Sequence, residues 1–197
     1  MAQFGRALAS GARGRQFKSG FPDHNLEVNM KKEIIIHPLE PIYTEDSKVL
    51  ILGSLPSQKS REESFYYANP KNRFWPVITK LFQENPLTKE EKIAFLKKHK
   101  LALWDVIHSC EIKGSSDASI RKVKANNIKS LLSKTKIKYI ITIGQTAKKY
   151  YDKLLLDQTQ MEAIVLPSTS PANAKMKEDD FIEKYKIIKE LLERGTS

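Results

Sequence analysis

The amino-acid sequence predicts an α/β protein, a three-layer α/β/α sandwich around a short, mainly four-stranded parallel sheet. Four short aliphatic runs alternate along the chain with longer segments whose apolar residues recur at helical spacing. Strands that alternate with helices are joined by right-handed crossovers, which give a parallel sheet with helices on both faces. At 197 residues the chain is long enough to bury the core of one such domain.

The four predicted strands are short and rich in β-branched and aliphatic residues. Glycine or proline ends three of them, which is typical of the boundary between a strand and a loop. The strands are expected at 48–53 (KVLILG), 101–106 (LALWDV), 137–144 (IKYIITIG) and 162–167 (EAIVLP).

Five further segments have the apolar spacing of amphipathic helices. Pro76 fits the first turn of the helix that begins near Phe74, because the first N–H groups of a helix need no intrahelical partner. Thr88 and Glu91 form a T-x-x-E capping box at the start of the next helix. The helices are expected near 74–82, 88–100, 127–133, 145–156 and 177–194.

Residues 1–29 differ in composition from the rest of the chain. Four basic residues and many small ones precede the first acidic residue, Asp23. This composition is typical of a leader, a tag or a disordered arm, and also of an organellar transit peptide. We therefore expect one folded domain at 30–197, with Met30 as a natural start.

The chain carries 34 Lys and Arg against 23 Asp and Glu, a formal net charge of +11. This excess favours a polyanionic partner such as nucleic acid, although many other basic proteins share it. The single cysteine, Cys110, cannot form an internal disulfide, and the four histidines lack zinc-site spacing. No apolar run reaches the roughly 18 to 20 residues that span a bilayer. We expect no structural metal and no membrane span.

Ligands of open parallel sheets bind outside the carboxyl ends of the strands. The segments 53–72, 105–116, 144–146 and 167–174 lie there in the predicted topology. The first and last of these are rich in Ser, Pro and Asn and poor in aliphatic residues, which suits a binding site better than a core.

The segment 53–75, GSLPSQKSREESFYYANPKNRFW, combines a polar loop with an aromatic triplet. Its residues 54–60 offer hydroxyl and backbone N–H groups that could grip a phosphate or a base edge, or could form an ordinary turn. They match neither a Walker A loop nor a G-x-G-x-x-G motif. Phe65, Tyr66 and Tyr67 could stack on an extruded base or anchor the loop, and we expect at least one residue of each kind.

Two polar side chains near the strand ends could have either a structural or a catalytic role. Asn72 could cap the helix that follows it, or its amide could orient a water molecule or a substrate, but an amide cannot remove a proton at neutral pH. Asp105 could be a general base or could brace a loop. His108 is expected to be structural, and no Ser or Cys lies at the spacing of a catalytic triad.

A second hydroxyl-rich loop, STS at 168–170, lies between Pro167 and Pro171. The prolines restrict its backbone, and the hydroxyl groups could bind a DNA phosphate or hold a strained turn. Its position at the same sheet edge as the first loop favours a shared site.

Taken together, three blocks resemble the uracil-DNA glycosylase superfamily and, within it, the hypoxanthine-DNA glycosylase (DNA-deoxyinosine glycosylase) family. The blocks are GSLPSQKSREESFYYANPKNRFW, LALWDVIHSCEIKGSSDASIRKVKANN and LPSTSPANA, spread over residues 48–175 in the family's order. The resemblance implies a single α/β/α domain and a monofunctional glycosylase without metal or cofactor that flips a damaged base out of DNA.

The resemblance also assigns roles to particular residues. Asn72 corresponds to the proposed catalytic asparagine of the family and is expected to orient the water or the base. The base-binding residues are expected to be Gly53, Ser54, Leu55, Phe65, Tyr66, Tyr67, Phe74 and Asp105. The DNA phosphates are expected to bind Ser57, Lys59, Ser168, Thr169 and Ser170.

Three features of the sequence depart from the wider superfamily. Ser54 and Leu55 lie where uracil-specific relatives often carry a catalytic Asp or Asn, and Leu166 lies where several relatives have a histidine. Both departures point to the hypoxanthine branch. Relatives also commonly have His-Pro where this chain has Asn69-Pro70, so a role for that histidine does not carry over.

The expected reaction is hydrolysis of the N-glycosidic bond of hypoxanthine in base-excision repair, with uracil and xanthine as further candidate substrates. Two alternatives remain: a free-nucleoside hydrolase or deoxyribosyltransferase, and a non-catalytic module that binds damaged DNA. The expected partner is DNA that contains deaminated bases, bound by a monomer. The expected location is the cytoplasm, at the nucleoid, unless residues 1–29 direct import into an organelle.

Overall fold

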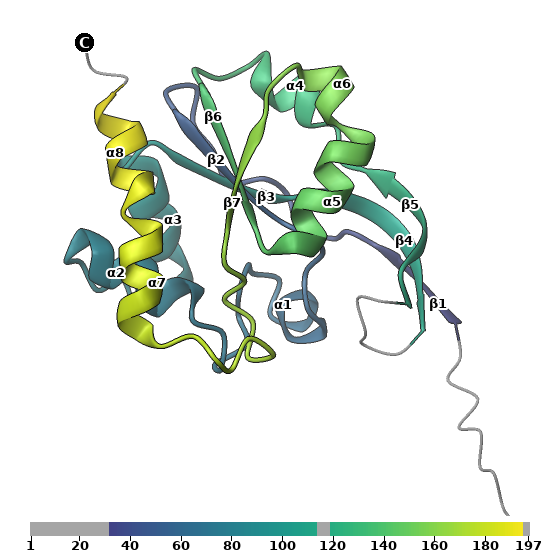
Figure 1. The fold of residues 1–197 in the computed structure, drawn as a ribbon, viewed down its shortest axis with the longest axis horizontal. Helices are drawn as coiled ribbons and strands as arrows, with labels where there is room; N and C mark the ends of the chain where they lie inside the picture. Colours follow the sequence, from purple (N-terminus) through teal and green to yellow (C-terminus); the bar gives the residue numbers. More distant parts are fainter. Residues whose placement is uncertain (1–31, 114–118, 195–197) are drawn as a thin grey trace, which may run out of the picture.

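A four-stranded parallel sheet with strand order β3-β2-β6-β7 forms the centre of the fold (Figure 1). The computed structural model describes residues 32–113 and 119–194. The residues of β2 pair in register with those of β3 and β6, and β6 pairs with β7. The strands are β2 Val49–Gly53, β3 Leu101–Asp105, β6 Tyr139–Ile143 and β7 Ala163–Leu166, which confirms all four predicted strands.

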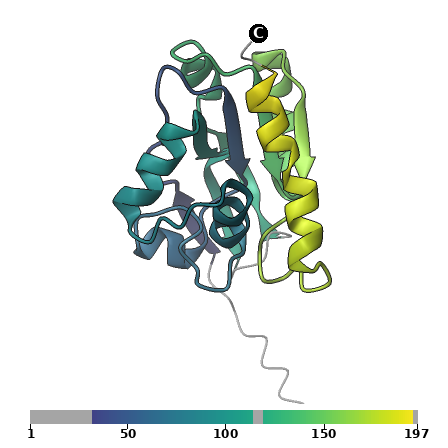
Figure 2. The same cartoon turned by 90° about the vertical axis from the view of Figure 1, so that its left-hand side faces the viewer.

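Helices cover both faces of this sheet because successive side chains of β2 point to opposite faces. Val49 and Ile51 pack with one set of helices, and Leu50 and Leu52 pack on the other side. Figures 1 and 2 show the resulting three layers, as predicted. The first set is α2 Phe74–Phe82, α3 Lys89–Lys98, α7 Glu178–Tyr185 and α8 Ile187–Glu193, and the second is α4 Ile128–Leu132, α5 Gln145–Leu154 and α6 Leu156–Thr159.

A second sheet, which the sequence did not predict, extends the layer that contains α4 to α6. It is antiparallel, in the order β1-β4-β5, with β1 Lys32–Ile36, β4 Ile107–Lys113 and β5 Arg121–Ala125. Part of the segment 105–116, which was expected beyond the carboxyl end of the second predicted strand, therefore forms β4. The pairing of β4 with β5 shifts register on both sides of Ser109, and such irregularities break the period of two that reveals a strand in a sequence.

The predicted helices all form, with changes at their ends. Thr88 caps α3 with the reciprocal Glu91 contacts of a capping box, and Asn127 caps α4. The segment 145–156 divides into α5 and the start of α6. The segment 177–194 divides into α7 and α8 at Lys186, whose backbone angles stay helical (φ −53°, ψ −32°). A short additional helix, α1 Gln58–Glu62, follows β2.

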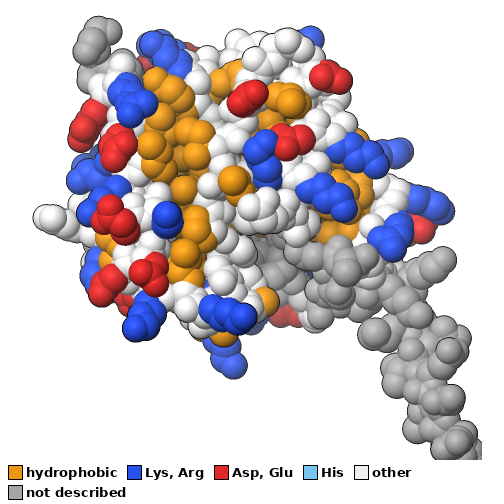
Figure 3. All heavy atoms as spheres, viewed as in Figure 1, with side chains coloured by type: hydrophobic (Ala, Val, Ile, Leu, Met, Phe, Trp, Pro, Cys, Tyr) orange, Lys and Arg blue, Asp and Glu red, His pale blue; other side chains and the backbone are white. Residues whose placement is uncertain are grey.

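The outer strand β7 leaves apolar side chains at the surface. Ile164 and Val165 are 37% and 36% exposed, and Figure 3 shows hydrophobic side chains gathered over this strand between α8 and α5.

Within the described part of the chain, no helix has the length and apolar character needed to cross a membrane. The expectation for residues 1–29 concerns a segment outside the described residues.

Arg73, the residue before α2, joins two loops that lie about a hundred residues apart in the chain. Its guanidinium group donates hydrogen bonds to the backbone oxygens of Ser170 (3.2 Å), Asn173 (2.6 Å) and Met176 (2.8 Å). Its backbone N–H also donates to the carbonyl of Thr169 at 3.1 Å. Arg73 therefore fixes the loop after β7 against the loop after β2.

Replacing Arg73 with lysine should loosen this connection, because a single ammonium group cannot donate in all the directions that a planar guanidinium group reaches. We expect Arg73→Lys to lower the free energy of unfolding in urea by about 1–3 kcal/mol. Lys80→Met is the matched control, because Lys80 of α2 forms an exposed ion pair with Glu178 of α7 nearby. The control should leave stability nearly unchanged, and an equal loss in both variants would contradict the role of Arg73.

Candidate active site

A cavity of about 650 Å³ lies at the carboxyl ends of β2, β3 and β6. Its walls come from the loops after β2 and β7, and Ile35 and Ile112 of the second sheet complete them. This volume is in the range of small-molecule sites and can hold a nucleobase. Of the residues expected at the site, those that line the cavity are Gly53, Ser54, Leu55, Ser57, Tyr66, Tyr67, Asn72, Asp105, Ser168, Thr169 and Ser170.

Three residues expected at the site do not line this cavity. Phe74 is fully buried behind Tyr67 and stacks on its ring, with the ring centroids 4.0 Å apart. Phe65 faces a smaller pocket of about 370 Å³ and stacks on Trp75 at 5.6 Å. The ammonium group of Lys59 lies 2.7 Å from the Glu63 carboxylate on the exposed side of α1.

The three neighbouring aromatic residues 65–67 point in different directions, as expected from their adjacency. The hydroxyl of Tyr66 donates to the backbone oxygen of Glu40 at 2.9 Å, so this ring ties the loop to the segment after β1. Tyr67 has a positive φ of 53° and presents its ring to the cavity. Burial, and then the nearby negative charge of Asp105, raises the pKa of both tyrosines, so both hydroxyls remain protonated donors.

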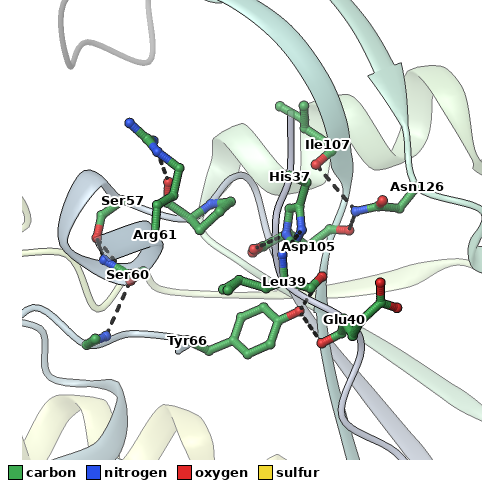
Figure 4. A network of polar contacts seen from close by, with 12 residues as sticks. His37, Leu39, Glu40, Ser57, Ser60, Arg61, Tyr66, Asp105, Ile107 and Asn126 are labelled. Carbon is green, nitrogen blue, oxygen red and sulfur yellow. Dashed lines mark hydrogen bonds and ion pairs between the residues drawn. The ribbon is translucent and has the colours of Figure 1, made fainter. Parts of the chain in front are cut away.

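The carboxylate of Asp105 is held from behind by a histidine (Figure 4). Its Oδ2 lies 2.8 Å from Nε2 of His37, and both side chains are almost completely buried. The Nδ1 atom of His37 accepts a hydrogen bond from the backbone N–H of Leu39 at 3.2 Å. A ring nitrogen that accepts carries no proton, so the proton of neutral His37 lies on Nε2 and is donated to Asp105.

Gly53, at the end of β2, makes room for this carboxylate. A Cβ atom at residue 53 would overlap Oδ1 of Asp105 and would lie 3.1 Å from the hydroxyl oxygen of Tyr67. The free carboxylate oxygen and the tyrosine hydroxyl therefore lie on the same side of Gly53. That hydroxyl is buried and has no hydrogen-bond partner among residues 32–113 and 119–194.

Asn72 lies just before α2, and one hydrogen bond to the start of that helix fixes the direction of its amide. Its Oδ1 accepts a hydrogen bond from the N–H of Phe74, the first residue of the helix, at 2.9 Å. Its own N–H donates to the carbonyl of Asn69 at 2.8 Å, which fixes the backbone. Asn72 lines both pockets, and the side-chain NH₂ group finds no acceptor within the described residues, so it is available to a ligand.

The serine-rich loops use their hydroxyl groups partly to hold their own backbone. Ser57 caps α1 through the N–H of Ser60, and Ser168 accepts from the N–H of Ser170. Thr169 is only 1% exposed, and its hydroxyl has no partner in the described structure, whereas Ser168 and Ser170 are half-buried at the rim. The two serines are thus better placed than Thr169 to meet a DNA backbone.

Sequence reasoning missed His37 and Arg73. His37 follows a strand that was itself not predicted, and a single histidine gives no signal of its partner 68 residues away. Arg73 is one of 34 basic residues, and its three backbone partners carry no sequence signature. Arg61 was also missed; it is the one cation among the described residues that line the larger cavity, and its guanidinium group donates to the carbonyl of Pro56 at 3.0 Å.

Comparison with known proteins agrees with this architecture. A family model described as the uracil DNA glycosylase superfamily matches residues 40–192. A protein of Methanosarcina acetivorans named hypoxanthine DNA glycosylase is 35% identical over 137 residues, covering 68% of this chain and 85% of the relative. A second, from Methanosarcina barkeri and of the same name, is 28% identical over 138 residues, covering 68% and 86%.

A solved structure shows the same arrangement of elements. It is the solution NMR structure of a candidate uracil DNA glycosylase from Methanosarcina acetivorans, with a TM-score of 0.67 and 31% identity, covering 80% of this chain and 99% of the other. The family match spans the central sheet and both loops that line the cavity. The chain belongs to the uracil DNA glycosylase superfamily.

Proposed function

We propose that this protein is a monofunctional DNA glycosylase that hydrolyses the N-glycosidic bond of hypoxanthine in DNA. The observation that carries the proposal is a base-sized cavity that brings the fixed amide of Asn72 together with Asp105 and both serine-rich loops. The names of the two Methanosarcina relatives support hypoxanthine as the substrate. We also propose that the enzyme acts as a monomer.

The lining of the cavity favours water over a protein amine as the nucleophile. A glycosylase that forms an imine with the sugar needs a lysine or an amino terminus close to the reacting carbon. Among the described residues that line the cavity, there is no lysine. Hydrolysis by a water molecule, with release of the free base, is the reaction that this set of side chains supports.

Asn72 is best suited to stabilise the departing base. Cleavage of the glycosidic bond leaves negative charge on the base and positive charge on the sugar, and fixed donors placed where negative charge develops lower the barrier. Because Oδ1 of Asn72 is engaged by the N–H of Phe74, the group that it offers to the cavity is the NH₂ donor. A site with a donor and no strong base favours good leaving groups, which supports uracil and xanthine as secondary substrates.

The first test is base release from duplexes that contain inosine, uracil, xanthine or only normal bases, followed by alkaline cleavage of abasic sites. We expect strand breaks with inosine and none with the normal duplex. The number of strand breaks should fall steeply as the salt concentration rises, because salt weakens the binding of this basic protein to the polyanionic DNA. Release of hypoxanthine from free deoxyinosine with a flat salt response would instead identify a nucleoside hydrolase, and tight binding of inosine duplex without base release would identify a binding module.

The role of Asn72 as a donor gives a second test. Asn72→Ala should lower the single-turnover rate on inosine DNA by about 10²- to 10³-fold. Asn72→Asp should lose comparable activity, because aspartate keeps the oxygen that accepts from the N–H of Phe74 but replaces the donor with a second acceptor.

The aspartate variant also serves as the stability control. Its urea midpoint should stay close to that of the wild-type protein, since aspartate keeps the oxygen that accepts from the N–H of Phe74. Activity equal to or above the wild-type level in Asn72→Asp would show that residue 72 acts as a water-activating acceptor and would contradict the donor role.

A further inference from the structure

Two polar groups at the inner end of the cavity are left for a ligand. Oδ1 of Asp105 lies against Gly53, and no described residue donates a hydrogen bond to it. The hydroxyl of Tyr67 lies on the same side of Gly53 and is buried without a partner. Buried polar groups normally have partners, so an acceptor and a donor left side by side indicate a ligand that supplies both complements.

The direction of each of these two groups is fixed. The Leu39 N–H bonds to Nδ1 of His37 and leaves the ring proton on Nε2, which is donated to Oδ2 of Asp105. The backbone oxygen of Asp105 is in turn bonded by the side-chain amide of Asn126 at 2.9 Å. With Oδ2 occupied in this way, the carboxylate presents Oδ1 as an acceptor. The ring of Tyr67 is stacked on Phe74, which holds its hydroxyl in place as the donor.

We propose that His37 is a positioning residue that fixes Asp105 as a hydrogen-bond acceptor, so that Asp105 and Tyr67 read the lactam edge of the flipped base. This inference rests on the proposed glycosylase function and names the chemical feature that the enzyme recognises. In hypoxanthine the ring N1 carries a proton and the neighbouring carbon carries O6. The N1–H donates to Asp105, and O6 accepts from the hydroxyl of Tyr67.

The same pair rejects adenine. The N1 atom of adenine has a lone pair and no proton, so two hydrogen-bond acceptors, N1 and the carboxylate oxygen of Asp105, would face each other. The buried carboxylate would then lack a donor, which costs binding energy. Uracil and xanthine also carry an N–H beside a carbonyl group, whereas cytosine, like adenine, does not. The pair therefore separates hypoxanthine from adenine and uracil from cytosine. It does not separate xanthine from guanine, because guanine shares the lactam edge.

Asp105→Asn tests the inference with almost no change of shape. The Nε2–H of His37 selects the oxygen of the new amide, so the NH₂ group turns to the base and a donor replaces the acceptor. Single-turnover rates are measured on duplexes that contain inosine or 2′-deoxynebularine, whose purine base has an unprotonated N1 and no O6. We expect the rate on inosine DNA to fall about tenfold to a hundredfold. The ratio of the rate on inosine DNA to the rate on nebularine DNA should fall by at least about tenfold.

Variants of His37 show whether this residue positions the carboxylate of Asp105 or only fills space in the core. His37→Leu removes the donor at similar volume and should lower the same ratio, because the carboxyl group of Asp105 is no longer held as an acceptor. His37→Gln can place an amide N–H near the position of Nε2 and should keep the ratio within about threefold of wild type. Tyr151→Phe is the matched control, because the hydroxyl of Tyr151 in α5 bonds Thr159 and Met161 away from the cavity, and its ratio should stay unchanged.

The outcomes distinguish this inference from the function on which it rests. A wild-type protein that cleaves inosine DNA, combined with an unchanged ratio in folded Asp105→Asn, overturns the reading of the lactam edge. A lowered ratio in Asp105→Asn together with an unchanged ratio in His37→Leu overturns the positioning role of His37. A wild-type protein that does not cleave inosine DNA refutes the proposed function itself. Circular dichroism checks the folding of each variant. If His37→Leu does not fold, His37→Gln is compared with Asp105→Asn instead. A ratio that stays near the wild-type value in His37→Gln and falls in Asp105→Asn supports the positioning role, and a ratio that falls in both variants overturns it.

Discussion

The cavity depends on the hydrogen bonds of one guanidinium group. The loop after β7 has no helix or strand of its own, so its path is set by what it contacts. Arg73 supplies three donors to its backbone and lies 4.3 Å from the ring centroid of Phe181, so that the loop and α7 are held at one point. The hydroxyl of Tyr185 adds a bond to the carbonyl of Pro167 at 2.7 Å. Because Asn72 precedes Arg73 in the chain, the same anchor sets the position of the amide relative to the serine-rich rim.

A second constraint is the small space between the ends of β2 and β3. Parallel pairing places Gly53 beside Asp105, and the absence of a side chain at residue 53 lets the carboxylate turn toward the cavity. Tyr67 closes the same space from the other side, with a left-handed backbone angle that costs about 1 kcal/mol or more for a residue with a Cβ atom. The stacking of its ring on Phe74 offsets part of this cost.

The central sheet could be predicted because β2, β3 and β6 are almost fully buried and appear as continuous apolar runs, and the outer strand β7 is apolar as well. The antiparallel sheet could not, since β5 is largely exposed and β4 is irregular, so neither gives a clear period of two. Within the cavity, Asn72, Tyr66 and Tyr67 stood out in the sequence because they cluster in one short segment. His37 and Arg73 act on groups far along the chain, and a single sequence contains no trace of such pairings.

The long sequence separation of the Arg73 contacts also affects the order in which the protein folds. The sheet can begin to form once β2 and β3 have left the ribosome, but the bond to Met176 needs nearly the whole chain. Contacts of this kind carry a large loop-closure cost and form late. A nascent or truncated chain that ends before this loop lacks one wall of the cavity and also α7 and α8, whose Phe181 and Tyr185 are fully buried in the core. The core and the cavity are therefore completed together, when synthesis is almost finished.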